Sequence, residues 1–216
     1  GIMDFESMLR VLPGIIIGLT VHEFAHASVA SRLGDDTATV QGRASLNPLV
    51  HIDPLGFIFL LVAGFGWAKP VVIDQSKLRH PRRDDAIIAA AGPLSNLALS
   101  ILGAAVFTML IGLVPYRGEP TYAWFLNALM AGIYVNLGLF VFNAIPLPPL
   151  DGSHILLSAL NLRDSPAAHQ IFRYGMILLF GIILAEQFFN VDILPIGKMV
   201  RALADVLLGI FGFSGL

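Results

Sequence analysis

The sequence predicts an all-α polytopic membrane protein with about five to six membrane segments, including a short membrane-associated β-hairpin or re-entrant segment. Of its 216 residues, 56% are hydrophobic and only 13% are charged, and the mean hydropathy is +0.78, which lies far outside the range of soluble domains. Several apolar runs reach the ~20 residues that a helix needs to cross a bilayer. The length suits one compact domain over residues 1–216.

The first apolar run covers residues 9–33, which is long enough to cross a ~30 Å hydrocarbon core at 1.5 Å per residue. It lacks a small-residue cleavage site, so we expect a retained span and not a signal peptide. The sequence VHEFAH lies toward its far end, at residues 21–26. Residues 34–53 are polar and rich in turn formers, and they predict a loop outside the lipid.

Residues 54–68 are apolar but would extend only about 22 Å as a helix, too short for a comfortable crossing. We therefore expect a re-entrant segment. Gly64, Gly66 and Pro70 break it, and residues 67–72 are expected to be extended. An exposed strand edge at residues 66–72 could pair with another chain by β-addition.

Three further runs predict membrane spans, at residues 86–114, 124–145 and 171–189. A final apolar run at residues 193–213 contains Pro195, Lys198, Arg201 and Asp205, so it either spans the membrane or lies at its interface.

Basic residues gather between residues 69 and 83, which the positive-inside rule places in the cytoplasm. If residues 54–68 do not cross, the first span carries residues 21–26 toward the cytoplasmic side. The next two spans go out and return, so Asp151 comes back to that same side.

Residues 22–26 form an HExxH box, which places His22 and His26 on one face of a helix where both imidazoles can hold one metal ion. Zinc fits best, because two imidazoles and a carboxylate leave a fourth position for water, with Glu23 beside the metal. The chain has no cysteine, so its ligands must be His and carboxylates. The alternative is a pair of buried, hydrogen-bonded histidines.

Asp151 stands at the end of an apolar span, in a stretch whose prolines and Gly152 force irregular backbone. Such backbone is tolerated at membrane depth where it is buried in protein or lines a watery cavity. Asp151 is the best third ligand for the two histidines. Taken alone, it would be interpreted as a helix N-cap.

The HExxH box resembles that of the site-2 protease family of intramembrane zinc metalloproteases. The resemblance extends to an NxxPxxxLDG pattern, to Gly92-Pro93 with Asn96, and to residues 64–70, which look like the membrane-associated β-hairpin of those enzymes; the pattern residues are Asn143, Pro146, Leu150, Asp151 and Gly152. Ser153 departs from the pattern, which often has a second Gly. The chain has no room for a PDZ or CBS domain, so it looks like the compact prokaryotic subgroup.

This resemblance implies one zinc ion per chain, bound by His22, His26 and Asp151. It also implies Glu23 as general base and Asn143 near the scissile peptide. The implied activity is hydrolysis within or near the transmembrane segments of membrane proteins. The expected setting is a multi-pass protein of the prokaryotic inner membrane, in contact with lipid, with its active site toward the cytoplasm.

Two other functions remain open: a transporter or proton relay, and a non-catalytic metal-site scaffold. A transporter should show repeated halves, which the sequence lacks, and a silent scaffold would be indicated by loss of Glu23. The net charge of −2 argues against a nucleic-acid partner. Three histidines in polar loops are expected to be solvated, namely His51, His80 and His169. His154 is expected either beside the metal ligands or merely at a helix start.

Overall fold

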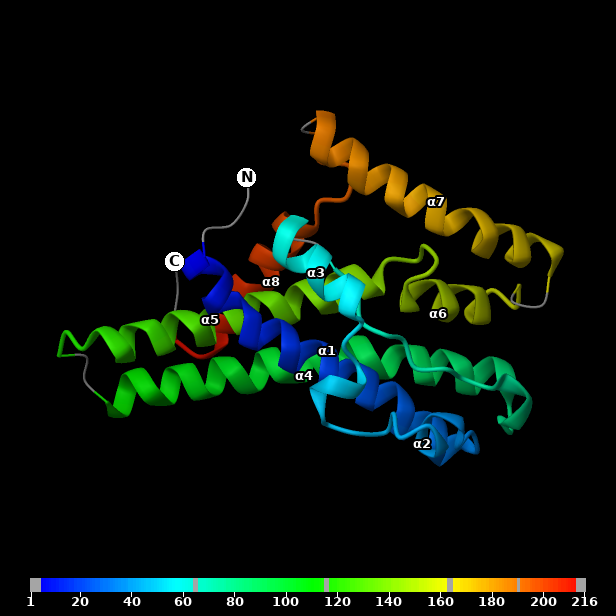
Figure 1. Cartoon of the computed structure of the whole chain (residues 1–216), viewed down its shortest axis with the longest axis horizontal. Helices are drawn as coiled ribbons and strands as arrows, with labels where there is room; N and C mark the ends of the chain where they lie inside the picture. The colour runs from blue at the N-terminus through cyan, green and yellow to red at the C-terminus, as the bar shows by residue number, and fades with distance from the viewer. Residues whose placement is uncertain (1–4, 64–65, 115–116, 163–164, 190, 213–216) are drawn as a thin grey trace.

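The computed structural model describes residues 5–63, 66–114, 117–162, 165–189 and 191–212 (Figure 1). Within these ranges, four helices are long and apolar enough to cross a membrane, over Glu6–Leu33, Pro81–Leu113, Pro120–Ala144 and Ala168–Glu186. This arrangement is that of an integral membrane protein. The prediction of about five to six segments is thus supported for four of them.

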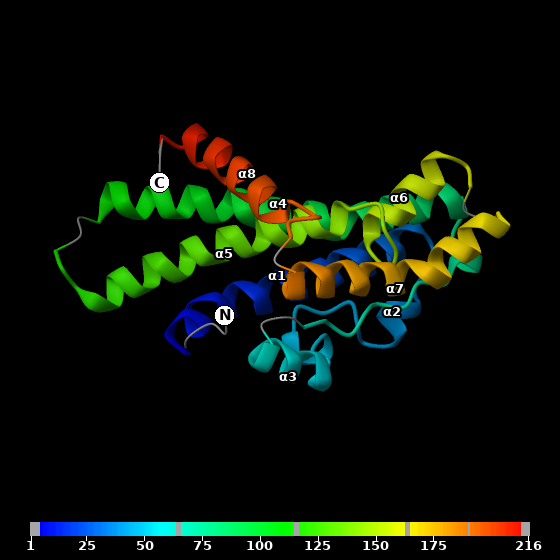
Figure 2. The ribbon, with the colours of Figure 1, turned by 90° about the horizontal axis from the view of Figure 1, so that it is seen from above.

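The centre of the bundle consists of α1 (Phe5–Leu33), α4 (Pro81–Leu113) and α5 (Pro120–Ala144), and α4 and α5 lie side by side (Figures 1 and 2). Small residues allow α1 to approach α5 closely. A Cβ atom on Gly14 would lie 2.7 Å from the Cα atom of Gly132. Such contacts between small residues are a common way to pack helices in membranes.

The helix α4 begins at Pro81, five residues before the predicted start of that span. Its start has recognisable signals, because His80 is the N-cap and Pro81 occupies the first turn, where its missing N–H costs nothing. The buried carboxylate of Asp84 accepts the His80 N–H at 2.8 Å. The basic loop therefore ends in a polar first turn of the helix.

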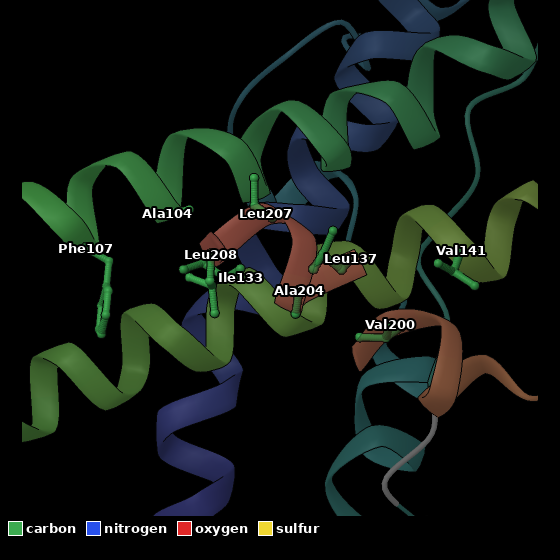
Figure 3. Packing of buried hydrophobic residues seen from close by; sticks show 9 residues of the cluster. All are labelled: Ala104, Phe107, Ile133, Leu137, Val141, Val200, Ala204, Leu207 and Leu208. Atoms are coloured by element: carbon green, nitrogen blue, oxygen red, sulfur yellow. The ribbon is translucent and has the colours of Figure 1, made fainter. Parts of the chain in front are cut away.

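The main apolar core lies where α8 (Ile196–Ile210) crosses α4 and α5 (Figure 3). One face of α8 is buried there, and the other side is exposed, including Val206 and Ile210. At about 22 Å, α8 is short for a spanning helix. The buried cluster consists of Ala104, Phe107, Ile133, Leu137, Val141, Val200, Ala204, Leu207 and Leu208.

The segment between α1 and α4 contains α2 (Thr37–Val40), the short helix η1 (Pro48–Val50), α3 (Pro54–Ala63) and η2 (Gln75–Lys77). The ten residues of α3 would reach only about 15 Å, so this helix does not span a bilayer. Residues 66–74 form no helix, Ala68 takes part in a β-bridge and Asp74 has an extended backbone, which agrees with the extended segment predicted at residues 67–72.

The predicted β-hairpin is reduced, within the described residues, to one antiparallel bridge between Ile52 and Ala68. The Lys69 N–H donates to the His51 carbonyl at 2.8 Å beside it. Gly64, one of the residues that suggested a hairpin, lies outside the described ranges. The expectation for His51 is wrong, since its side chain is buried and its Nε2 bonds to the Ser45 carbonyl at 2.7 Å. His80 and His169 are exposed, as predicted.

After α5 the chain makes an irregular turn into α6 (Asp151–Ala159), and α7 (Pro166–Phe189) follows. In Figure 1 α7 lies apart from the bundle of α1, α4 and α5. It touches the turn after α5, because a Cβ atom on Gly175 would lie 2.8 Å from Cβ of Pro148. The turn that leads into α6 therefore lies against α7.

Candidate metal centre

Three side chains from distant parts of the sequence meet between α1 and α6. His22 Nε2 and His26 Nε2 are 3.0 Å apart, and Oδ2 of Asp151 lies 3.2 Å from the first and 3.4 Å from the second. Both histidines are buried, and Asp151 is partly buried. These atoms form a group that can hold a metal ion. The structure thus brings together the three ligands expected from the sequence.

The far side of each imidazole is fixed by a hydrogen bond. His22 Nδ1 lies 2.7 Å from Oδ1 of Asn96, and His26 Nδ1 lies 2.7 Å from the Ile88 carbonyl oxygen. Asn96 is oriented in turn, because its Nδ2 donates to the Gly18 carbonyl at 3.0 Å and to Oδ1 of a second buried asparagine. Both rings must therefore carry their proton on Nδ1, which leaves the two Nε2 lone pairs facing Asp151.

This arrangement fits a metal ion. Three acceptor atoms face one another, and Oδ2 of Asp151 is buried with no hydrogen-bond partner among the described residues. A cation between its members would satisfy all three acceptor atoms. In a tetrahedral zinc site with bonds of about 2.0–2.1 Å, ligand atoms are roughly 3.3–3.4 Å apart. The separations of 3.0, 3.2 and 3.4 Å agree with that geometry.

Two glycines leave the space that these side chains need. A Cβ atom on Gly92 of α4 would lie 2.4 Å from Nε2 of His26 and 2.6 Å from Nε2 of His22. A Cβ atom on Gly152 would lie 2.3 Å from the Ala144 carbonyl oxygen, at the end of α5. The absence of a side chain at Gly92 therefore leaves room for the ligand nitrogens. Gly152 allows the start of α6 to lie close to the end of α5.

Asp151 is the first residue of α6, and the N-cap is Leu150. The alternative in which Asp151 caps the helix is therefore wrong. A carboxylate in the first turn still benefits from the positive end of the helix dipole. Its carboxylate lies against the two histidines instead of bonding to the first helical N–H groups.

The three ligand side chains line a cavity of ≈ 360 Å³ together with Glu23 and Asn143. The Glu23 carboxylate accepts the Val71 N–H at 2.9 Å, which ties the extended segment to α1. Asn143 donates from Nδ2 to the Leu139 carbonyl at 3.0 Å. Glu23 lies on the cavity wall and outside the group of three ligands, as the sequence suggested.

A polar anchor holds the extended segment against the end of α1. The fully buried Asp35 accepts the Thr37 N–H at 2.9 Å and the Asp74 N–H at 2.7 Å. Burial acts to raise the pKa of Asp35, but these N–H groups and the Lys77 ammonium lower it below its ordinary value of 3.8. Asp74 is three residues beyond Val71, so this anchor fixes the backbone that contacts Glu23.

Two other residues of the cavity wall were not among the candidates from the sequence, namely Asp85 and Gln75. Asp85 is buried, and its Oδ2 lies 3.0 Å from Nδ1 of His154. Of the two roles left open for His154, the structure places it beside the ligands, on the wall of the same cavity. The available signal was an acidic residue immediately before the predicted span at residues 86–114, close to the membrane, where an ionisable group is costly unless it has a partner.

A family model described as peptidase family M50 matches residues 114–185, which include Asn143 and Asp151 but not the HExxH box. Three curated relatives, each named "Putative zinc metalloprotease", match longer stretches that cover most of this chain. YwhC of Bacillus subtilis is 45% identical over 146 residues, covering 66% of this chain and 65% of the relative. MJ0611 of Methanocaldococcus jannaschii is 32% identical over 155 residues, covering 71% and 73%. The chain belongs to peptidase family M50.

The third relative, Rip2 of Mycolicibacterium smegmatis, is 30% identical over 175 residues, covering 79% of this chain and 64% of the relative. The chain thus spans slightly less than two thirds of the length of YwhC and of this Rip2. No solved structure matches it. Membership of the M50 family agrees with the resemblance of its two motifs to the site-2 proteases.

Proposed function

We propose that this M50 protein is an intramembrane zinc metalloprotease that hydrolyses peptide bonds within or near transmembrane segments of other membrane proteins. The observation that carries the proposal is that the Nε2 atoms of His22 and His26 converge with Oδ2 of Asp151. Glu23 lies on the wall of the same cavity. The site is built on α1, one of the helices long and apolar enough to cross a membrane.

His22, His26 and Asp151 would hold one zinc ion per chain. Zinc, when bound, would polarise the scissile carbonyl and lower the pKa of water toward neutrality. Asn96 and the Ile88 carbonyl hold the two imidazoles in the tautomer that metal binding requires.

Glu23 acts as the general base in this proposal. Its carboxylate takes a proton from the attacking water and later delivers it to the amine that leaves. The Val71 N–H donates to Oε2 and holds the carboxylate in place on the cavity wall. A silent metal scaffold would have no need for this carboxylate.

Asn143 is proposed to bind the substrate backbone beside the scissile bond. Its Nδ2 is held by the Leu139 carbonyl, so the amide is oriented before substrate arrives. A fixed amide on the cavity wall can bond to a peptide group or to the oxyanion that develops on the carbonyl.

The proposed substrate is a membrane-spanning segment that unwinds locally, since the carbonyls of an intact helix are engaged in hydrogen bonds. The extended segment at residues 66–72 is one candidate to pair with the unwound chain. At Val71 the N–H already bonds to Glu23, so pairing at that atom would require the contact to open.

We place the site toward the cytoplasmic side of the prokaryotic inner membrane, because the basic residues between 69 and 83 belong to a segment that lines its cavity. Single introduced cysteines test this in a chain without native cysteine. A cysteine at Lys77 or Gln41 should react from the cytoplasm, and one at Gly118 from outside. Labelling at Gln41 and Lys77 from opposite faces would show that α3 crosses the membrane.

The activity is tested with Glu23→Gln and the unsubstituted protein, each reconstituted in phospholipid vesicles with a panel of single-span membrane proteins. Fragments are identified by mass spectrometry, and zinc is measured on the same preparations. We expect zinc to be retained in both and cleavage only by the unsubstituted protein. Cleavage by zinc-loaded Glu23→Gln at an undiminished rate would refute the general-base role, and an unsubstituted protein without zinc would refute the metalloprotease.

A further inference from the structure

The cavity that holds the metal-ligand group has a second polar pair on its wall, formed by His154 of α6 and Asp85 of α4. Nδ1 of His154 lies 3.0 Å from Oδ2 of Asp85. The other oxygen of Asp85 accepts from Nε2 of Gln75 at 3.2 Å. The mechanism above uses none of these residues.

The ring of His154 is held in place from two sides. Asp85 fixes its Nδ1 edge, and the ring of Phe172 on α7 meets it edge to face, with ring centroids 5.1 Å apart. His154 follows Asp151 by three residues on the same helix, so the two side chains are neighbours on one face, with Cβ atoms about 5–6 Å apart. This spacing corresponds to roughly two residues of an extended peptide.

The pairing with Asp85 determines what His154 can offer to a bound molecule. An ionised carboxylate is only an acceptor, so the proton of the neutral ring resides on Nδ1. Nε2 then carries a lone pair and is a hydrogen-bond acceptor. The backbone N–H groups of an unwound substrate need such acceptors, because an unpaired N–H away from water is costly.

We propose that His154 is a substrate-binding residue whose Nε2 accepts a backbone N–H of the substrate, one or two residues from the scissile peptide, with Asp85 as the positioning residue that sets its tautomer. This inference rests on the proposed protease function and names a contact within that site. It assigns different tasks to two neighbouring residues on one face of α6, since Asp151 holds the metal and His154 holds the peptide.

The test uses a probe that needs no knowledge of the natural substrate, a tripeptide hydroxamate with apolar side chains. A matched series carries one N-methyl group in place of each amide N–H in turn. Affinities are measured by competition on zinc-loaded, full-length protein in detergent. We expect one N-methyl analogue to bind the unsubstituted protein on the order of tenfold more weakly than the parent. His154→Phe should bind the parent more weakly by a similar factor and should not discriminate against that analogue.

The variant Asp85→Asn separates positioning from packing. Gln75 donates to one oxygen at this site, so the Asn side chain would keep its oxygen there and present its NH₂ group to His154 Nδ1. The ring would then carry its proton on Nε2 and lose its acceptor. We expect the same loss of affinity with zinc content and thermal stability retained, and ¹⁵N NMR shifts of the His154 ring should show the tautomer change. The control is His169→Phe, which removes an exposed histidine of α7 away from the cavity.

If His154→Phe binds the whole series as the unsubstituted protein does, the proposal is wrong while the metalloprotease stands. Should His154→Phe fail to fold, the N-methyl series on the unsubstituted protein still decides, because equal affinity of every analogue would exclude the contact. A wild-type protein that binds neither zinc nor hydroxamate would instead refute the proposed function itself.

Discussion

Replacing Gly92 with alanine should weaken metal binding strongly while leaving the fold intact. The added Cβ atom would lie 2.4 Å from Nε2 of His26 and 2.6 Å from Nε2 of His22, whereas ordinary contacts begin at 3.4 Å. The two rings would have to retreat by about 1 Å, and the hydrogen bonds on their Nδ1 atoms oppose that movement. Loss of an outer hydrogen-bond partner alone typically costs 10–100-fold in metal affinity. We therefore expect zinc affinity to fall by about 100-fold or more.

The assay is competition for zinc against a chromophoric chelator, with thermal stability measured on the same preparation in detergent. The matched control is Gly112→Ala, on the same helix, where an added Cβ atom meets nothing within 4 Å. That variant should bind zinc normally and be stabilised by up to about 1 kcal/mol through helix propensity. Gly92→Ala with wild-type zinc affinity would refute the geometry assigned to the ligand nitrogens.

Three further predictions concern the hydrogen bonds around the site. Asn96→Ala should weaken zinc binding by about 10–100-fold, measured by the same chelator competition, because His22 loses the partner of its Nδ1; unchanged affinity would contradict that role. Val71→Pro removes the N–H that Glu23 accepts, so cleavage should fall with zinc content unchanged, and normal cleavage by a zinc-loaded variant would show that the bond is dispensable. Asp35 has a lowered pKa, so its stabilising contribution is present above 3.8 and is lost as the pH falls through the lower value of the folded state. Thermal melts should therefore show a smaller acid-induced loss of stability for Asp35→Asn, and identical pH profiles would oppose this assignment.

The ligands could be predicted from sequence because their signals are local. The spacing of His22 and His26 places them on one helical face. The prolines that precede Asp151 predict irregular backbone there. Four of the predicted apolar runs, at residues 9–33, 86–114, 124–145 and 171–189, also correspond to helices long enough to span, although α4 starts earlier than its hydropathy suggests. The helix start is indicated by Pro81, which is favoured in the first turn of a helix. The polar composition of these residues, taken alone, predicts only a loop.

The remaining features depend on contacts between distant parts of the chain. His51 was expected to be solvated because its neighbours are polar, but the loop folds back so that its ring bonds to Ser45 and is buried. His154 pairs with Asp85, which is 69 positions away in the sequence, and no periodic pattern of residues predicts that contact. The bond from Val71 to Glu23 requires the extended segment to lie across α1, which the sequence around Val71 does not specify.

The central claim is that Asp151 completes a metal site with the two histidines of α1, and the most direct test is the zinc-to-protein ratio of purified Asp151→Ala. Asp205→Ala, which removes an exposed carboxylate of α8, is measured beside it. We predict about one zinc per chain in the unsubstituted protein and in Asp205→Ala, and almost none in Asp151→Ala, because two imidazoles remain where a stable site needs three protein ligands. Full zinc retention by a folded Asp151→Ala variant would remove Asp151 from the ligand set and contradict the account.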